Sequence, residues 1–150
     1  MASRRKEIIE FLVTQLKEID GQTSGFSASY TYGNNLFNNV FRKLKFLDEV
    51  NDFPAIYISA GTEIRDFNSK NLTLASLDAT IRAYVFGEDN SQDLSDSLVQ
   101  DIEHVIYSLG DNPDKGILDI TIDNISTDEG LATPYGIAEV ELTIVYRLDG

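Results

Sequence analysis

The sequence predicts an α+β fold, in which a small, mainly antiparallel sheet of about four to five strands carries two helices packed on one face. Two segments repeat apolar residues at helical spacing, and three segments alternate apolar and polar residues as half-buried strands do. The order along the chain is helix, loop, strand, strand, helix, strand, strand. Because 150 residues is the length of one ordinary domain, we expect a single domain over residues 1–150.

The first helix is expected over residues 4–19, where apolar residues form one stripe. Ser3 is a suitable N-cap, and Gly21 ends the helix as glycine does just beyond a helix terminus. The stripe consists of Ile9, Leu12, Leu16 and Ile19.

Residues 21–39 are rich in glycine, serine, threonine, asparagine and tyrosine, and we interpret them as a long loop with a loose strand at residues 27–32. Loops of this length in small domains often contact other molecules. A floppy connector is the alternative. Residues 40–50 predict a short element whose apolar spacing fits a helix or a strand equally well.

Residues 54–60 predict a strand that begins with proline, where no hydrogen-bond donor of the sheet is lost. Residues 61–71 are polar and are expected to form a loop. Residues 72–86 predict a long strand with one buried face. That face consists of Leu77, Ala79, Ile81, Ala83 and Val85. The other, wetter face is expected to consist of Asp78, Thr80, Arg82 and Tyr84.

A second helix is expected after Gly87, capped by Asn90 or Ser91 and ended by Gly110. A turn at residues 111–116 leads to a strand at 117–126, a loop at 127–134 and a last strand at 135–148. The expected buried residues are Leu118, Ile120 and Ile122 in the first of these strands, and Ala138, Val140, Leu142, Ile144 and Tyr146 in the second.

Charge is divided unevenly along the chain. The formal net charge is −13, yet residues 1–45 hold seven basic and four acidic side chains. Such an acidic chain repels nucleic acid. It is equally consistent with solubility alone, or with self-assembly in which the basic part of one subunit meets the acidic part of its neighbour.

The residue types exclude most site chemistry. The sequence has no cysteine and one histidine, His104, so neither a catalytic triad nor a zinc site is expected. Residues 111–114 lack the distal glutamate of a calcium loop. We therefore predict no catalytic residue, metal or cofactor, and we expect His104 at the surface or against a partner. The aromatic side chains of residues 26–41 are expected to pack on a neighbouring subunit.

No membrane contact is expected either. The apolar run after the basic N-terminus is interrupted by Glu7 and Glu10, which argues against an export signal. No stretch approaches the roughly 18 apolar residues that a membrane-spanning helix requires.

The stretch Ile125–Val140, with the sequence ISTDEGLATPYGIAEV, resembles the last hairpin of the tail terminator, or tail completion, proteins of long-tailed bacteriophages. Shorter similarities occur in the same order at residues 48–54, 61–63, 82–84 and 101–103. Together they cover roughly residues 40–147.

This resemblance implies a structural, non-enzymatic virion protein. Such proteins form a six-membered ring that caps the finished tail tube, stops its polymerisation and offers an interface to the neck of the head. The implied partners are other copies of the chain, the tail tube protein, a neck or head-completion protein and, in contractile tails, the sheath. DNA passes through the lumen without specific binding. The implied location is the virion tail, and the host cytoplasm during assembly.

Two loops and one basic segment are the candidate interfaces, because ring closure needs two different, complementary patches on each subunit. The basic segment contributes Arg42, Lys43 and Lys45. The loops at 61–71 and 127–134 contribute Glu63, Arg65, Asp66, Lys70, Asp128 and Glu129. They could equally be ordinary solvated hairpin tips.

Three alternatives remain at this stage. Another neck or baseplate component could share the same plan of sheet and helices. A small-ligand-binding or regulatory α+β domain belongs to a different class, and an enzyme that uses paired carboxylates is a further one.

Overall fold

The computed structural model describes residues 4–69, 72–109 and 116–148, with the backbone alone for residues 67–69 and 72. Predictions for Ser3, Lys70, Gly110 and residues 111–115 fall outside these ranges. The elements are α1 (Arg4–Leu16), β1 (Val40–Phe41), the 3₁₀ helix η1 (Leu47–Glu49), β2 (Ala55–Ser69), β3 (Leu72–Phe86), α2 (Ser91–Leu109), β4 (Ile117–Thr127) and β5 (Tyr135–Arg147).

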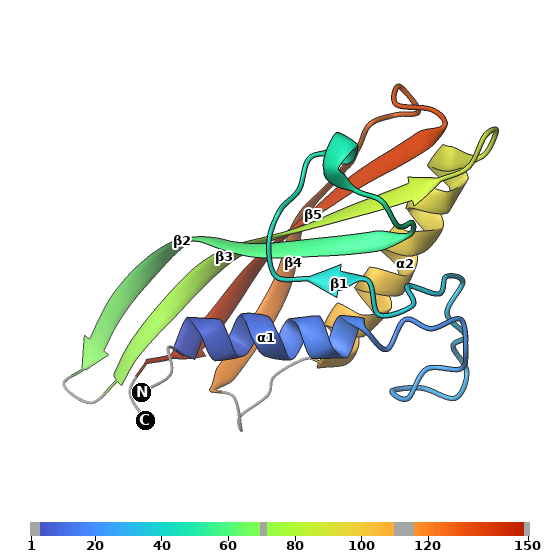
Figure 1. Cartoon of the computed structure of the whole chain (residues 1–150). Helices are drawn as coiled ribbons and strands as arrows, with labels where there is room; N and C mark the ends of the chain where they lie inside the picture. Colours follow the sequence, from blue (N-terminus) through green and yellow to red (C-terminus); the bar gives the residue numbers. More distant parts are fainter. Residues whose placement is uncertain (1–3, 70–71, 110–115, 149–150) are drawn as a thin grey trace.

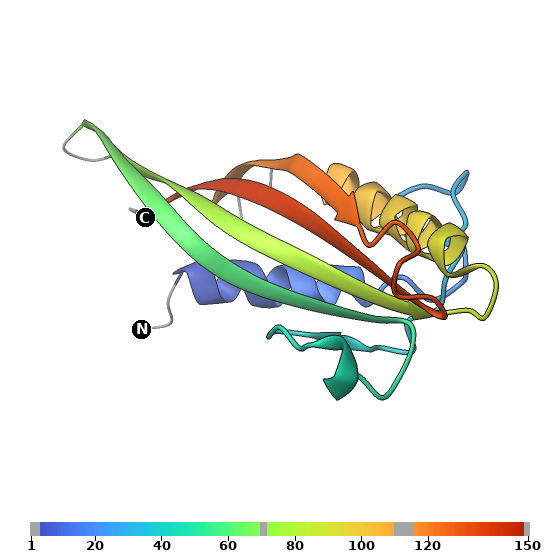
Figure 2. The same cartoon turned by 90° about the horizontal axis from the view of Figure 1, so that it is seen from above.

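The five strands form one sheet in the order β1-β2-β3-β5-β4. All neighbours run antiparallel except the short β1, which is parallel to β2. Figures 1 and 2 show a strongly curved sheet, and the β2–β3 hairpin extends past the start of α1 at one end. The predicted α+β class and the mainly antiparallel sheet are confirmed.

The main core lies between the helices and one face of the sheet. The apolar stripes of α1 and α2 pack together with the inward residues of β2, β3, β4 and β5. The predicted buried faces of β3 and β5 are confirmed, since each of their named residues is at most 3% exposed. Alternation of period two therefore identified β3 and β5 correctly, because each has one face against the core.

The opposite face of the sheet is covered at one end. Tyr57 and Tyr84 point away from the helices and pack with Val50 and Ala55 in a second, smaller cluster. The segment between β1 and β2 supplies this cover, so Tyr84, predicted on the wetter face, is buried. The ambiguous residues 40–50 thus form a two-residue strand and a 3₁₀ turn.

The predicted loop at residues 61–71 is wrong over residues 61–69, which continue β2 and pair with β3. A β-bulge between Ala60 and Glu63 adds one residue to β2. The bulge reverses the alternation, so Glu63 pairs with inward-facing Leu77 and Ile64 is 68% exposed. Polar composition and a broken alternation made this paired strand look like a loop.

A second bulge explains a wrong burial pattern in β4. Ile117 pairs with Tyr146 and Asp119 with Val145, which leaves Leu118 unpaired. Leu118, predicted to be buried, is exposed, and Ile117 is buried in its place. Ile120 is buried as predicted, and Ile122 is partly buried against the core.

The first helix and the following loop also differ in detail. The α-helix ends at Leu16 rather than at residue 19, and the chain tightens there through a hydrogen bond from the Ile19 amide to the Leu16 carbonyl at 3.1 Å. No strand forms at residues 27–32. Two isolated bridges, Asp20 with Asn35 and Thr23 with Thr31, fold the loop on itself.

Candidate assembly surfaces

Residues 41–46, which we call the aromatic–basic ridge, project large apolar and positive side chains from the edge of the sheet. Phe46 is 73% exposed and Leu44 is 40% exposed. Arg42 and Lys43, which precede Leu44, are also exposed, and Arg42 lies 3.9 Å from a carboxylate oxygen of Glu10. The ridge combines apolar area with positive charge, as surfaces that bind other proteins often do.

The backbone of the ridge is held in place by the sheet. The ring of Phe41 stacks on Tyr57 with 5.4 Å between ring centroids. The Tyr84 hydroxyl donates to the Lys45 carbonyl, and the Lys45 ammonium lies 5.8 Å from the centre of the Tyr57 ring. These contacts use Phe41 and Lys45 internally and leave the other side chains facing outward. The ridge is therefore preorganised, which lowers the entropy cost of binding.

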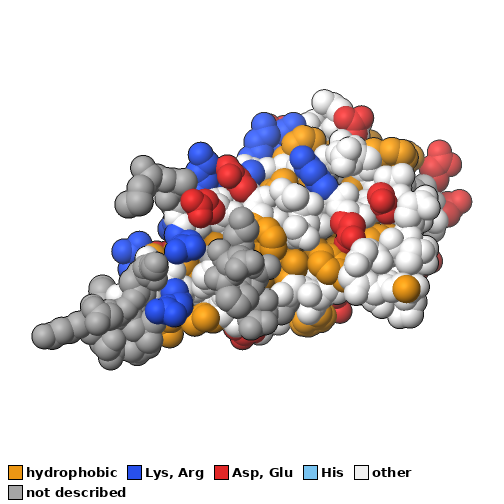
Figure 3. Space-filling view, turned by 90° about the horizontal axis from the view of Figure 1, so that it is seen from below, with side chains coloured by type: hydrophobic (Ala, Val, Ile, Leu, Met, Phe, Trp, Pro, Cys, Tyr) orange, Lys and Arg blue, Asp and Glu red, His pale blue; other side chains and the backbone are white. Residues whose placement is uncertain are grey.

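Charge is also divided in space. On the face seen in Figure 3, Lys and Arg side chains lie toward the left and the centre, with some Asp and Glu among them, while the right end carries Asp and Glu. The uneven distribution along the sequence thus becomes an uneven distribution over this face. Such a division favours head-to-tail contact between copies over contact between identical patches.

The outer half of the β2–β3 hairpin holds three of the predicted interface residues. Asp66 is exposed, and the Arg65 side chain is 55% exposed. The Glu63 side chain is only 6% exposed and turns toward the helices. One of its carboxylate oxygens accepts from Arg65 Nε at 2.8 Å, and the other accepts from the Tyr146 hydroxyl. Glu63 therefore holds the hairpin to β5.

The electrostatics of Glu63 agree with this internal role. Burial by itself raises the pKa of a carboxyl, but the hydrogen bonds from Tyr146 and Arg65 favour the ionised form more strongly. The pKa of Glu63 is therefore lowered. Burial and the bond to Glu63 raise the pKa of Tyr146, so its hydroxyl keeps its proton and remains a donor.

The loop between β4 and β5 holds the other two predicted residues, and they have different roles. Asp128 accepts hydrogen bonds from the Ala132 amide at 2.8 Å and the Ile137 amide at 3.2 Å, so it organises the loop. Glu129 is exposed at a positive φ of 58°. Leu131 at the tip is 89% exposed. The outward contacts of this loop therefore come from Glu129 and Leu131.

These two surfaces lie at opposite ends of the sheet. The register pairs Leu74 with Arg147 at the hairpin end, and Phe86 with Tyr135 at the end where the β4–β5 loop lies. Figure 1 shows the separation directly. The predicted polar residues therefore form two sites that could bind two different partners.

The long loop at residues 21–39 is bound to α2 by a buried carboxylate. Asp101 is 1% exposed. Its Oδ1 accepts from the Tyr30 hydroxyl at 2.6 Å and the Gly33 amide at 3.1 Å. Its Oδ2 accepts from the amide and the side chain of Asn34 at 3.0 and 2.9 Å. The floppy-connector interpretation is wrong for this loop.

Most aromatic side chains of this loop are also used internally. Tyr30 stacks on His104 at 3.9 Å, and Nε2 of His104 lies 2.7 Å from Ser24 Oγ. The prediction of a surface or partner-packing position for His104 is therefore corrected, since it packs against the subunit's own loop. Burial and the bond to Asp101 raise the pKa of Tyr30. Of the aromatic residues 26–41, Phe37 stays the most exposed, at 71%.

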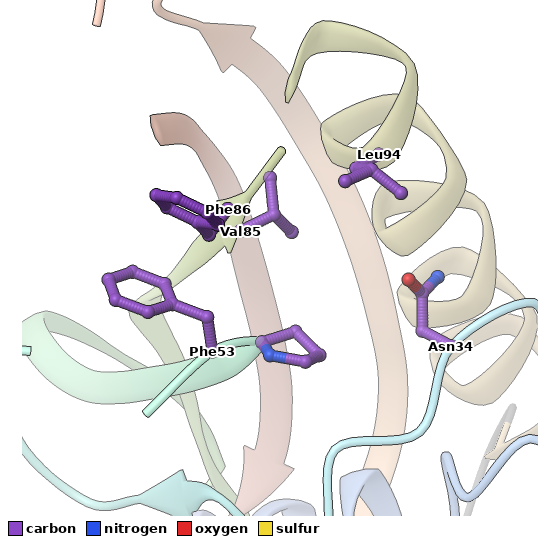
Figure 4. A pocket seen from close by; sticks show the side chains of 6 residues that line it. Asn34, Phe53, Val85, Phe86 and Leu94 are labelled. Carbon is purple, nitrogen blue, oxygen red and sulfur yellow. The ribbon is translucent and has the colours of Figure 1, made fainter. Parts of the chain in front are cut away.

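A pocket of about 410 Å³ opens where β2 begins and β3 ends. Figure 4 shows Phe53 and Phe86 on the sheet side, with Leu94 and Asn34 on the side of α2 and the loop. Pro54 and Val85 complete the lining, which is largely apolar. Sequence reasoning missed both this pocket and the apolar residues of the ridge. The sequence signal that could have indicated the ridge is the run of large apolar residues beside the positive charges at residues 41–46.

Within the described ranges, no group of three or more acidic or histidine side chains is placed to hold a metal ion. Among the same residues, no helix is long and apolar enough to cross a membrane. No buried side-chain polar atom in this part of the chain lacks a hydrogen-bond partner.

Comparisons with known proteins agree with the resemblance seen in the sequence. A family model described as bacteriophage tail tube terminator protein matches residues 2–149. The chain is 30% identical to the tail tube terminator protein p142 of Escherichia phage T5, over 95% of this chain and 93% of that protein. A chain in the virion of a native gene transfer agent particle shares the fold, with a TM-score of 0.52 and 11% identity, covering 90% of this chain and 91% of that one. This chain belongs to the bacteriophage tail tube terminator family.

Proposed function

We propose that the protein forms a six-membered ring that caps the finished tail tube, stops its polymerisation and presents the interface to the head and neck. Membership of the tail tube terminator family carries this proposal, because the family match spans nearly the whole chain. As a member, the protein is a structural component of the virion tail. Its role is to assemble and not to catalyse a reaction.

The two ends of the sheet support a position between two partners. A cap must bind the tube on one side and the neck on the other. The β2–β3 hairpin, with Arg65 and Asp66, and the β4–β5 loop, with Glu129 and Leu131, lie at opposite ends. We assign one to the tube and the other to the neck. In a contractile tail, the outer surface of the ring would also meet the sheath.

The division of charge supports ring closure. A closed ring needs head-to-tail interfaces, in which one patch of a subunit meets a different patch of the next. Arg42, Lys43 and Lys45 are the basic contribution from the ridge, and the chain after residue 45 is strongly acidic. A predominantly acidic lumen would let DNA pass without binding, because like charges repel.

Native mass spectrometry and negative-stain microscopy, with and without purified tail tubes, test this function. We expect six-fold rings, free or on tube ends, and tubes that no longer elongate when the protein is added. If the protein does not bind tail tubes, the proposal is wrong. Saturable binding of a metabolite without tube binding would favour a ligand-binding domain instead.

Charge reversal tests the contribution of the ridge. Changing Arg42, Lys43 and Lys45 to glutamate should prevent ring closure, because it places like charges across the interface. A double variant that spares Lys45 guards against misfolding, since Lys45 contacts Tyr57. Lys17→Glu, at an exposed position on the turn after α1, is the matched control. Unchanged rings in both variants would refute the contribution.

A further inference from the structure

We propose that the apolar pocket between β2, β3 and α2 receives the aromatic–basic ridge of the neighbouring copy. This inference rests on the proposed ring and identifies the contact that joins its subunits. The inserted side chains are Leu44 and Phe46. The receiving residues are Phe53, Phe86 and Leu94.

The ridge and the pocket match in polarity. Phe46 is 73% exposed and Leu44 is 40% exposed, so both leave apolar surface area in contact with water. Burial of this area against another apolar surface would stabilise a complex. The pocket of about 410 Å³ lies within the usual range of pockets that hold small ligands, so it can admit an aromatic side chain. Aromatic anchors in such pockets typically dominate binding energy.

The two surfaces also match in charge. Arg42 and Lys43 directly precede Leu44, the first inserted residue, and both are exposed. Glu88 and Asp89 follow Phe86 directly in the turn to α2, and both are exposed. Positive groups on one subunit therefore meet carboxylates at the rim of the next. This complementarity argues for a second copy as the occupant.

The positions of the two surfaces allow a ring. The ridge leads into η1 on one side, and the chain leaves η1 on the other side toward the start of β2 (Figure 1). The pocket lies at that end of β2, because Phe53 and Pro54 line it. Because the ridge and the pocket lie at different places on one subunit, their contact between copies is head-to-tail, and such an interface can close into a ring. The ridge cannot insert into the pocket of its own subunit unless its backbone moves, and the contacts of Tyr57 and Tyr84 hold that backbone in place.

Strand addition between copies is the main structural alternative, and the edges of the sheet oppose it. The edge strand β4 is interrupted by two irregularities, at Ile117/Asp119 and Ile122/Asn124. The open part of β2 has its own bulge at Ala60/Glu63. Bulges at an edge prevent regular pairing with another strand. Contact through side chains is therefore favoured for this subunit.

Cross-linking tests the contact directly, because the chain has no natural cysteine. A Lys43→Cys, Glu88→Cys chain, which keeps Leu44 and Phe46 in place, should give a ladder of covalent species up to the hexamer when it is treated with a short bis-maleimide in the presence of tail tubes. Each single variant should remain mostly monomeric. The matched control pairs Glu88→Cys with Tyr107→Cys, an exposed aromatic position elsewhere on α2. A ladder in the control equal to that of the test pair would overturn the proposal.

Mixing and charge exchange test the direction of the contact. Phe46→Asp removes the aromatic anchor of the ridge. Glu88→Lys together with Asp89→Lys reverses the charge beside the pocket. Each variant alone should lose rings, while an equal mixture should stop at heterodimers, since only one productive interface is possible. A chain that carries Arg42→Glu and Lys43→Glu together with the two rim reversals should recover rings. Variants that keep wild-type rings would overturn the proposal.

These outcomes separate the contact from the function. If wild-type rings form and cap tubes but the ridge and pocket neither cross-link nor respond to mutation, the contact is wrong and the function stands. If the wild-type chain neither forms rings nor binds tubes, both are overturned. Phe46→Ala, the mildest variant, should raise the concentration needed for assembly roughly ten- to a hundred-fold.

Discussion

Two neighbouring irregular segments of this protein use aromatic side chains in opposite ways. The loop at residues 21–39 turns most of them inward, where Tyr30 and Tyr32 pack beside His104. The aromatic–basic ridge at residues 41–46 turns Phe46 outward. Both segments lack long regular elements, and both are held to the rest of the subunit. The difference shows that aromatic content alone does not identify an interface, and that the decisive property is whether the subunit itself supplies a partner.

The contrast has an energetic consequence. Changes in the inward loop should lower the stability of the subunit, because they leave buried polar groups without partners. Changes on the ridge should affect assembly and hardly affect stability.

Asp101→Ala should lower the free energy of unfolding by about 3 kcal/mol, because it removes a buried acceptor that satisfies four donors of the loop. Urea unfolding measures this loss, and limited proteolysis should show earlier cleavage within residues 21–39. Asp96→Ala, at an exposed position on the same helix, is the control. A loss below about 1 kcal/mol would mean that Asp101 does not hold the loop.

The β4–β5 loop allows the same comparison between adjacent residues. Asp128→Ala should cost about 1.5 kcal/mol, because the amides of Ala132 and Ile137 lose their acceptor. Glu129→Ala should cost less than about 0.5 kcal/mol, because that side chain is exposed. Thermal or urea unfolding of the two variants checks the difference. Equal losses would show that Asp128 does not organise the loop.

Sequence analysis identified the regular parts of the fold and missed features that depend on single inserted residues or distant contacts. β3 and β5 keep an uninterrupted alternation, and their buried faces were predicted correctly. The bulges at Ala60/Glu63 and Ile117/Asp119 shift the alternation by one residue. No local pattern marks the position of such a bulge, so the outer part of β2 and the burial of Leu118 were predicted wrongly.

The candidate surfaces show the same division. The exposure of Arg42 and Lys43 could be predicted from their residue types, because charged side chains are mostly found in contact with water. Glu63 and Asp128 carry the same negative charge as their exposed neighbours Asp66 and Glu129, but they accept hydrogen bonds inside the subunit. Their role depends on partners brought close by folding; Tyr146 is 83 residues from Glu63 along the chain. The pocket beside Phe86 likewise combines residues from separate elements.

Glu63→Gln should lower the free energy of unfolding by an amount that depends on pH. The pKa of Glu63 is lowered from its ordinary value of 4.5, so its ionised form stabilises the fold above that pH. This stabilisation is lost as the pH falls through the lower pKa of the folded state. We expect a loss of about 1 kcal/mol for Glu63→Gln at pH 7, shrinking below about pH 4.5. Urea unfolding over this pH range measures it, and a constant difference would contradict it.

The smallest expected effect on stability belongs to the ridge. Phe46→Ala should change the free energy of unfolding by less than about 0.5 kcal/mol, because the ring is 73% exposed and makes few contacts to lose. The same substitution removes the proposed anchor of the subunit interface and should weaken assembly strongly. Urea unfolding of the dilute monomer, compared with ring formation by native mass spectrometry, separates the two effects. Tyr107→Ala, similarly exposed on α2, should change neither quantity. If Phe46→Ala destabilised the monomer as much as Asp101→Ala does, the ridge would belong to the core of the subunit, because only an inward side chain can contribute that much to stability.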